Sequence, residues 1–208
     1  ACAVEALRAG AQDYLVKGQA DGRLLSSAIR YAMARNQTQD VLRNLALREE
    51  LTGLYNRRGF VTLAEQHLKL ARRAGRAVLL VFVDVNGFKR VNDRFGHPEG
   101  DRALVAVAEV LRATFRESDI VARVGGDEFA VLAIEAADAS AERLRARLSS
   151  NLEAYNAQAR RGYDLTVTAG IATFDPQRPA GVDALMAEAD RSLYDLKRLR
   201  QQERPGGA

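Results

Sequence analysis

The stretch RVGGDEFAVL, residues 123–132, predicts a β-hairpin that carries two acidic residues at its tip. Apolar residues stop at Gly125 and Gly126, and the neighbouring acids Asp127 and Glu128 follow before the apolar run resumes. A pair of glycines permits a tight turn and lets another group approach the backbone closely. The hairpin alone fits two interpretations: a cation site, or a glycine turn decorated with solvated acids.

Another carboxylate ends the apolar run AVLLVFVDV, residues 77–85. A continuous run of this kind is typical of a strand buried on both faces. If that strand neighbours the hairpin, Asp84 meets Asp127 and Glu128 at one edge of a sheet. Three carboxylates there would raise one another's pKa values unless a cation lay between them. Mg²⁺ fits such a site, because it takes a few carboxylates and leaves its other positions to water and phosphate.

Residues 83–101, VDVNGFKRVNDRFGHPEGD, carry groups suited to a nucleotide. The backbone N–H groups where a helix follows the strand form an anion site, and Lys89 on that helix could meet a phosphate. Asn92 and Asp101 can read a guanine edge, the carboxylate accepting from its N1–H and N2–H₂ groups. Each of these three residues also has an ordinary structural explanation, so their joint occurrence is what favours a nucleotide site.

The order of expected elements predicts an α/β fold, in the sense of an α+β sandwich, with the hairpin inserted into a sheet flanked by helices. Helices are expected at residues 58–74, 87–95, 100–115, 139–159 and 181–200. Strands are expected at residues 77–85 and 163–174, in addition to the hairpin at 120–134.

A long helix is expected upstream, over residues 21–35 and onward to about residue 45. The apolar residues that share one face of it are Leu25, Ala28, Ile29, Ala32 and Met33. This thin stripe fits a connector that pairs with a second copy of the chain. It fits equally a helix packed on its own domain.

The composition limits the class of protein. The 208 residues, 47% of them hydrophobic, suffice for one full domain plus a fragment or linker. The longest apolar run, residues 78–83, is far too short to span a membrane. The single cysteine, Cys2, excludes an intramolecular disulfide and fits the reducing cytoplasm. A net charge of +4 permits a nucleic-acid partner without requiring one, and we expect none.

Four linked motifs resemble the GGDEF family of bacterial diguanylate cyclases. They are LTGLYNRRGF (51–60), DVNGFKRVNDRFGHPEGD (84–101), GGDEF (125–129) and ADRSLYDLK (189–197). The resemblance implies a fold related to nucleotidyl cyclases and the polymerase palm, with a central mixed sheet and an N-terminal connector helix. It also implies a homodimer that condenses two GTP into 3′,5′-cyclic di-GMP with release of two pyrophosphates.

The resemblance further assigns roles to individual residues. Mg²⁺, with Mn²⁺ as a substitute, would be held by Asp84, the Val85 carbonyl, Asp127 and Glu128. Glu128 would help deprotonate the attacking 3′-hydroxyl, and Asp127 and Lys89 would act with it in catalysis. The substrate-binding residues would be Gly87, Phe88, Lys89, Asn92, Asp101, Gly125, Gly126 and Lys197. RESD, residues 116–119, resembles an inhibitory RxxD site, at which Arg116 and Asp119 would bind the product cyclic di-GMP.

The N-terminal piece, ALRAGAQDYLVKG with the helix at 21–35, resembles the last third of a response-regulator receiver. Lys17 would be its phosphate-sensing lysine, and an upstream histidine kinase would be a partner if the receiver is intact in the full protein. The expected organisation is therefore a partial receiver at 1–35, a helical linker at 36–48, the cyclase domain at 49–200 and a disordered tail at 201–208.

Three positions depart from the family pattern. Glu49 stands where an Asp is usual, Asn86 replaces a common second Asp, and RLRQQ follows Lys197 in place of Gly-Arg-Asn. One alternative is therefore a degenerate member that binds GTP or cyclic di-GMP as a sensor. Another is an RNA-binding module, although the hairpin offers only Phe129 for base stacking, beside two acids. A third is a dimerisation and signalling module.

Overall fold

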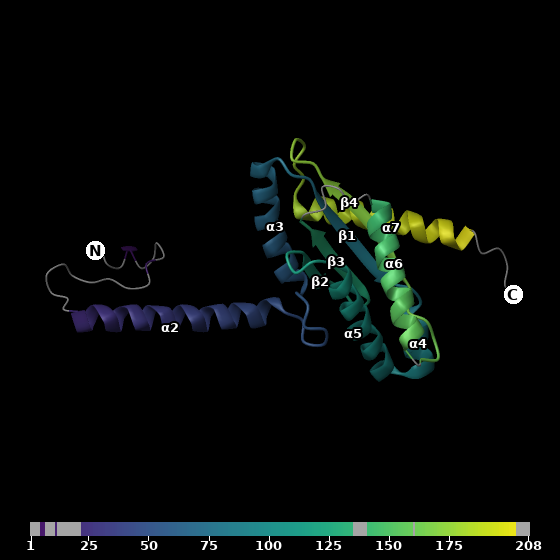
Figure 1. Cartoon of the computed structure of the whole chain (residues 1–208), viewed down its shortest axis with the longest axis horizontal. Coiled ribbons are helices and arrows are strands. Elements are labelled where there is room, and N and C mark those ends of the chain that lie inside the picture. Colours follow the sequence, from purple (N-terminus) through teal and green to yellow (C-terminus); the bar gives the residue numbers. More distant parts are fainter. Residues whose placement is uncertain (1–4, 7–10, 12–21, 135–140, 160, 203–208) are drawn as a thin grey trace. The chain divides into compact units, whose positions relative to one another are not determined.

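The computed structural model describes residues 5–6, 11, 22–134, 141–159 and 161–202, with the backbone alone for 35–46 and 201. It divides into two compact units, residues 1–46 and residues 47–208 (Figure 1), and each is considered by itself. Lys17 and most of the predicted receiver segment lie outside the described residues. The predicted tail at 201–208 needs one correction, because the last helix extends to Gln202.

Most of the described residues of the first unit belong to helix α2, Gly22–Leu47, whose last residue falls in the second unit; this helix confirms the expected long helix. Its apolar face is not covered by other described residues of the unit: Leu25, Ile29 and Met33 are 48%, 51% and 59% exposed. Pairing of this face with a second copy stays a prediction. In the part of the chain that the structure describes, no helix combines the length and the apolar character needed to cross a bilayer.

The second unit is built on a four-stranded sheet in the order β2-β3-β1-β4. The strands are β1 Val78–Val85, β2 Ile120–Arg123, β3 Glu128–Ala133 and β4 Val167–Phe174. The α/β fold class is confirmed, with one correction: all adjacent strands pair antiparallel, whereas the family resemblance implies a mixed sheet. The two helical crossovers, β1 to β2 and β3 to β4, each skip one strand position. Parallel strands are therefore never neighbours, as in the ferredoxin-like arrangement.

Helices cover both faces of this sheet (Figure 1). Helices α3 (Arg57–Ala74) and α7 (Val182–Gln202) bury one face, with Phe60 and Leu185 in its core. Helices α5 (His97–Thr114) and α6 (Ala141–Gln158) bury the other, with Leu111 and Leu148 in its core. Successive residues of β1 alternate between the two cores, which confirms that this strand is buried on both sides and explains its unbroken apolar sequence.

Local signals place the helix ends close to the predicted positions. Asn56 caps α3, because its side-chain oxygen accepts a hydrogen bond from the Gly59 N–H at 2.9 Å. The short helix α4, Phe88–Phe95, begins after Gly87, whose φ of 69° suits glycine. Helix α5 begins at His97 rather than at residue 100, since Pro98 is favourable in a first helical turn.

Candidate active site

The structure brings the predicted acids together at one end of the sheet. Asp84 on β1 lies directly opposite Glu128 on β3 in the antiparallel register. Residues in such a pair project from the same face of a sheet. The Val85 N–H donates to the Asp127 carbonyl at 3.1 Å, which fixes the turn against the end of β1. The half-buried Asp127 and Glu128 therefore lie beside Asp84, as the sequence predicts.

Electrostatics link these carboxylates. Burial is the main cause that raises the pKa of Glu128, and the charges of Asp127, Asp84 and Asp190 raise it further. Burial also raises the pKa of Asp84, partly offset by its hydrogen bond and ion pair with Lys197. Neighbouring acids that disfavour one another's charged forms supply the hard oxygen donors that Mg²⁺ prefers. The chemistry of these oxygen donors therefore suits a divalent cation.

The side chains do not form a closed coordination shell as they stand. Among the described residues, no three His, Cys, Asp or Glu side chains are grouped closely enough to hold a metal ion. Instead, Lys197 from α7 contacts Asp84, with 2.5 Å between Nζ and Oδ1. Lys197 contributes positive charge at this sheet end, as Arg57 does near Glu128, and these charges offset part of the repulsion between the acids.

Asp190 was not among the residues that the sequence singled out for this site. Its negative charge raises the pKa of both Asp84 and Glu128. The signal available in the sequence was its spacing from Lys197: residues seven apart on a helix share a face. Helix α7 thus presents one acid and one lysine toward the same end of the sheet.

The two glycines of the hairpin tip have different surroundings. A methyl group at Gly125 would collide with the Glu128 carboxylate, so Gly125 makes room for that side chain. Nothing lies within 4 Å of a methyl group placed at Gly126, which is exposed. A side chain at Gly125 would therefore displace the Glu128 carboxylate, whereas Gly126 leaves one side of the tip open to a ligand.

Several residues predicted to bind the nucleotide lie on helix α4 or next to it. Gly87 and Phe88 form its start, with Lys89 exposed on its first turn. Asn92 packs against Gly100, the neighbour of Asp101, and a methyl group at Gly100 would collide with the Asn92 side-chain oxygen. That oxygen is buried, and no described residue donates a hydrogen bond to it. A buried acceptor without a partner fits a ligand that brings donors, as the guanine edge does.

Asn86, which departs from the family pattern, forms hydrogen bonds that link the end of β1 to β4. Its amide donates to the Thr166 hydroxyl at 3.3 Å, and its oxygen accepts from the Thr168 hydroxyl at 2.8 Å. Arg200 in turn donates to the Thr168 oxygen at 3.1 Å. Asn86 thus joins the end of β1 to β4, and its side chain is engaged away from the acids.

The RxxD residues border a separate pocket of about 360 Å³. The Asp119 carboxylate accepts hydrogen bonds from the N–H groups of Arg116 and Ile134, both at 2.9 Å, so it holds the turn before β2. Arg116 lines the pocket together with Arg48 and Arg112. Three arginines around one pocket, which Glu117 also lines, suit a ligand with phosphate groups.

Comparison with known proteins agrees with this fold. The family model "Diguanylate cyclase, GGDEF domain" matches residues 46–203. The chain therefore belongs to the GGDEF family of diguanylate cyclases. This membership favours a nucleotide site over the RNA-binding alternative.

Two similar proteins are named for different activities, one as a phosphodiesterase and one as a cyclase. The chain is 36% identical over 156 residues to the cyclic di-GMP phosphodiesterase NbdA of Pseudomonas aeruginosa, covering 75% of this chain and 20% of that protein. It is 38% identical over 160 residues to the diguanylate cyclase DgcP of the same organism, covering 75% of this chain and 23% of that protein. The chain thus spans about a quarter or less of the length of these two relatives.

A solved structure of the family is also similar to this chain. The coiled coil and GGDEF domain of DgcB from Caulobacter crescentus, in complex with c-di-GMP, superposes with a TM-score of 0.69 at 28% identity. The match covers 85% of this chain and 93% of that one.

Proposed function

We propose that this chain is an active diguanylate cyclase that condenses two GTP into cyclic di-GMP and releases two pyrophosphates. The observation that carries the proposal is the register pairing of Asp84 with Glu128 beside Asp127, in a chain of the GGDEF family. Asp84, the Val85 carbonyl, Asp127 and Glu128 would hold Mg²⁺, or Mn²⁺ in its place. When bound, the ion would stabilise the charge that develops on the α-phosphate.

The protein's own groups would bind and orient GTP. The Gly87 and Phe88 N–H groups at the start of α4, with Lys89 and Lys197, would hold its phosphates. Asn92 and Asp101 would read guanine, and the open side of Gly126 would admit the nucleotide to the hairpin. Glu128 would take the proton of the attacking 3′-hydroxyl. In-line placement of the two reactants would supply much of the rate.

The reaction requires a homodimer, because each domain offers one guanine pocket and the product joins two nucleotides. Two such sites must face one another so that each 3′-hydroxyl reaches the α-phosphate held by the partner. The apolar face of α2, exposed in the single chain, is a candidate for holding the two copies together.

Replacing Gly100 with alanine is expected to weaken GTP binding by about tenfold or more, because the added methyl group displaces the Asn92 side chain from the proposed guanine pocket. Binding of a non-hydrolysable GTP analogue, measured by calorimetry, checks this result. Gly181→Ala is the control, since nothing lies within 4 Å of a methyl group there. Equal affinities for the two variants would contradict the assignment of Asn92.

The pocket beside Arg116 and Asp119 is proposed as a site for inhibition by the product. Arg116→Ala is expected to keep the basal rate within about twofold and to raise the product concentration needed for half-inhibition by about tenfold or more, because a charged phosphate contact is lost. Steady-state rates with added cyclic di-GMP check this. Arg116 is the better probe, since the Asp119 carboxylate also holds the turn. Unchanged inhibition would remove the assignment.

The second candidate is a sensor that binds GTP or cyclic di-GMP without catalysis, favoured by the departures at Glu49, Asn86 and after Lys197. Incubation with GTP and Mg²⁺, followed by chromatography, separates the two. A sensor would bind nucleotide and return it unchanged.

We also propose that this protein works in the cytoplasm as part of a two-component signalling system. Residues 1–35 would close a receiver domain that an upstream histidine kinase phosphorylates, and residues 36–48 would link it to the cyclase domain at 49–200.

A further inference from the structure

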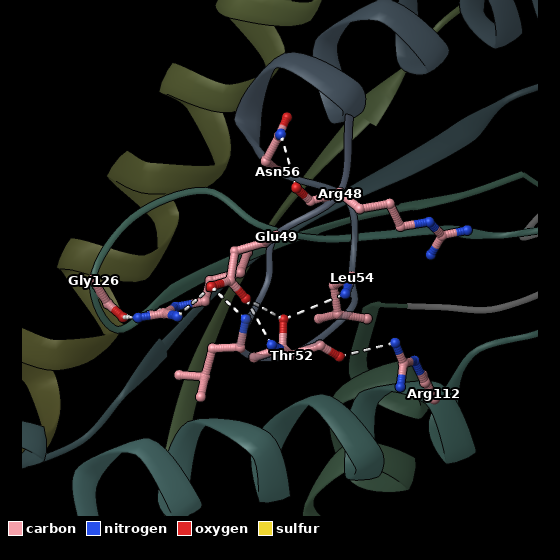
Figure 2. A network of polar contacts seen from close by, with 9 residues as sticks. Arg48, Glu49, Thr52, Leu54, Asn56, Arg112 and Gly126 are labelled. Carbon is pink, nitrogen blue, oxygen red and sulfur yellow. Dashed lines mark hydrogen bonds and ion pairs between the residues drawn. The ribbon is translucent and has the colours of Figure 1, made fainter. Parts of the chain in front are cut away.

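The loop at residues 48–56, which precedes α3, is joined to the catalytic hairpin by a continuous set of polar contacts. Figure 2 shows Glu49, Thr52 and Gly126 within this network. The Glu49 carboxylate accepts from the Leu51 N–H at 3.1 Å, the Thr52 N–H at 2.8 Å and the Thr52 hydroxyl at 2.6 Å. These three bonds fix the carboxylate inside its own loop.

Arg123, the last residue of β2, connects this fixed carboxylate to the hairpin tip. Its Nη1 donates to Glu49 Oε1 at 2.9 Å, across 74 residues of sequence. Its Nε and Nη2 both donate to the Gly126 carbonyl, at 3.1 Å and 2.8 Å. The Arg123 and Glu49 side chains are only 16% and 23% exposed, so water screens this pair less than a surface ion pair.

The tip itself has few other supports. Apart from the Arg123 side chain, the described bonds to this turn run from the N–H groups of Val124 and Gly125 to the Glu128 carbonyl, at 2.9 Å and 3.3 Å, and from the Val85 N–H to the Asp127 carbonyl, at 3.1 Å. Gly125 and Gly126 have no side chains with which to anchor the turn. The loop, in contrast, is tied down, because Arg112 on α5 donates to the Thr52 carbonyl at 3.0 Å.

We infer that Glu49 and Arg123 act as one brace that positions the tip of the hairpin, and with it Asp127 and Glu128. The inference rests on the proposed cyclase activity, to which it adds two positioning residues that do not touch substrate. A guanidinium fork suits this task, since it binds a carboxylate and a carbonyl at once in a fixed plane. A displacement of about 1 Å at a reacting group can lower a rate by about 100-fold.

The variants Glu49→Gln and Arg123→Gln, singly and together, test the brace. Gln at position 49 keeps the size and one acceptor oxygen but loses the charge that Arg123 binds. Each single variant is expected to lower kcat by about 10- to 100-fold while changing KM for GTP by less than about threefold, because the tip moves and the nucleotide pocket does not. The double variant is expected to be no slower than the slower single variant. Glu49→Asp, which keeps the charge, is expected to retain more activity than Glu49→Gln.

The matched control is Arg145→Gln. Arg145 also donates to a main-chain carbonyl, that of Ala169 on β4 at 3.0 Å, but it is not bonded to the hairpin. Its kcat is expected to stay within about twofold of the parent chain.

Amide hydrogen exchange measures the local stability of the hairpin tip independently of catalytic activity. The amides of residues 124–128 are expected to exchange about tenfold faster in Glu49→Gln and Arg123→Gln, and at the parent rate in Arg145→Gln. If residues 124–128 exchange faster in Glu49→Gln and Arg123→Gln but the parent chain makes no cyclic di-GMP, the positioning role of Glu49 and Arg123 stands and the proposed cyclase activity is wrong. The brace would be overturned if both single variants kept the parent kcat and the parent exchange rates. It would also be overturned if the fold-loss of kcat in the double variant equalled the two single fold-losses multiplied together.

Discussion

Asp127→Asn is expected to lower the rate of cyclic di-GMP formation by at least about 1000-fold, the loss that several kcal/mol of transition-state stabilisation implies. Asparagine has nearly the same size as aspartate but removes the negative charge from the proposed Mg²⁺ site. The fold should survive, because Asp127 accepts the hydrogen bond from the Val85 N–H with its main-chain carbonyl, which the substitution leaves unchanged. Rates from product chromatography and melting temperatures of the same samples check both parts.

The control for this variant is Asp164→Asn, the same substitution at an exposed position before β4. It should leave both the rate and the melting temperature near those of the parent chain. If Asp127→Asn retained more than a tenth of the parent rate, the metal role of Asp127 would have to be abandoned.

Gly170→Ala is expected to destabilise the second unit by about 3 kcal/mol, the upper end of the usual cost of overpacking a core. Gly170 on β4 lies directly under α7, and a methyl group there would collide with the Ala189 carbonyl and the Leu193 N–H. Both obstacles are helix backbone, so the helix must move as a whole. Because α7 carries Lys197 and Asp190, the shift should also reduce activity.

Thermal unfolding measures this effect. A loss of that size lowers the melting temperature by roughly 6–12 °C in a domain of this length. Gly181→Ala at the start of α7 has open space for its methyl group and should change the melting temperature little. Equal melting temperatures for the two variants would show that α7 adapts to a methyl group at Gly170.

The proximity of Asp84 to Asp127 and Glu128 could be predicted from the sequence. Each of these acids lies at the end of an apolar strand, and the strands have to share one core. The brace between Glu49 and Arg123 could not, since it joins residues 74 apart by side chains that each have many other rotamers. The role of Asn86 could not be predicted either: its partners Thr166 and Thr168 lie just before and within β4, and only the pairing of β1 with β4 brings them near.

Strand pairing and strand limits depend on contacts that a local pattern does not contain. The apolar and β-branched pattern predicts a strand from residue 163, but β4 begins at Val167. The preceding residues are engaged elsewhere: the Tyr163 hydroxyl donates to Glu99 at 3.0 Å, and the Leu165 N–H donates to the Asn156 side chain at 3.0 Å. The antiparallel sheet likewise follows from the two crossovers that each skip a strand, and residue patterns do not reveal strand order.

The most direct test of the central claim is incubation of the protein with GTP and Mg²⁺ at concentrations that favour dimers, with the products identified by chromatography and mass spectrometry. We expect one cyclic di-GMP and two pyrophosphates for every two GTP consumed, and no product once EDTA removes the metal. Recovery of unchanged GTP from a folded, dimeric and nucleotide-bound protein would contradict it.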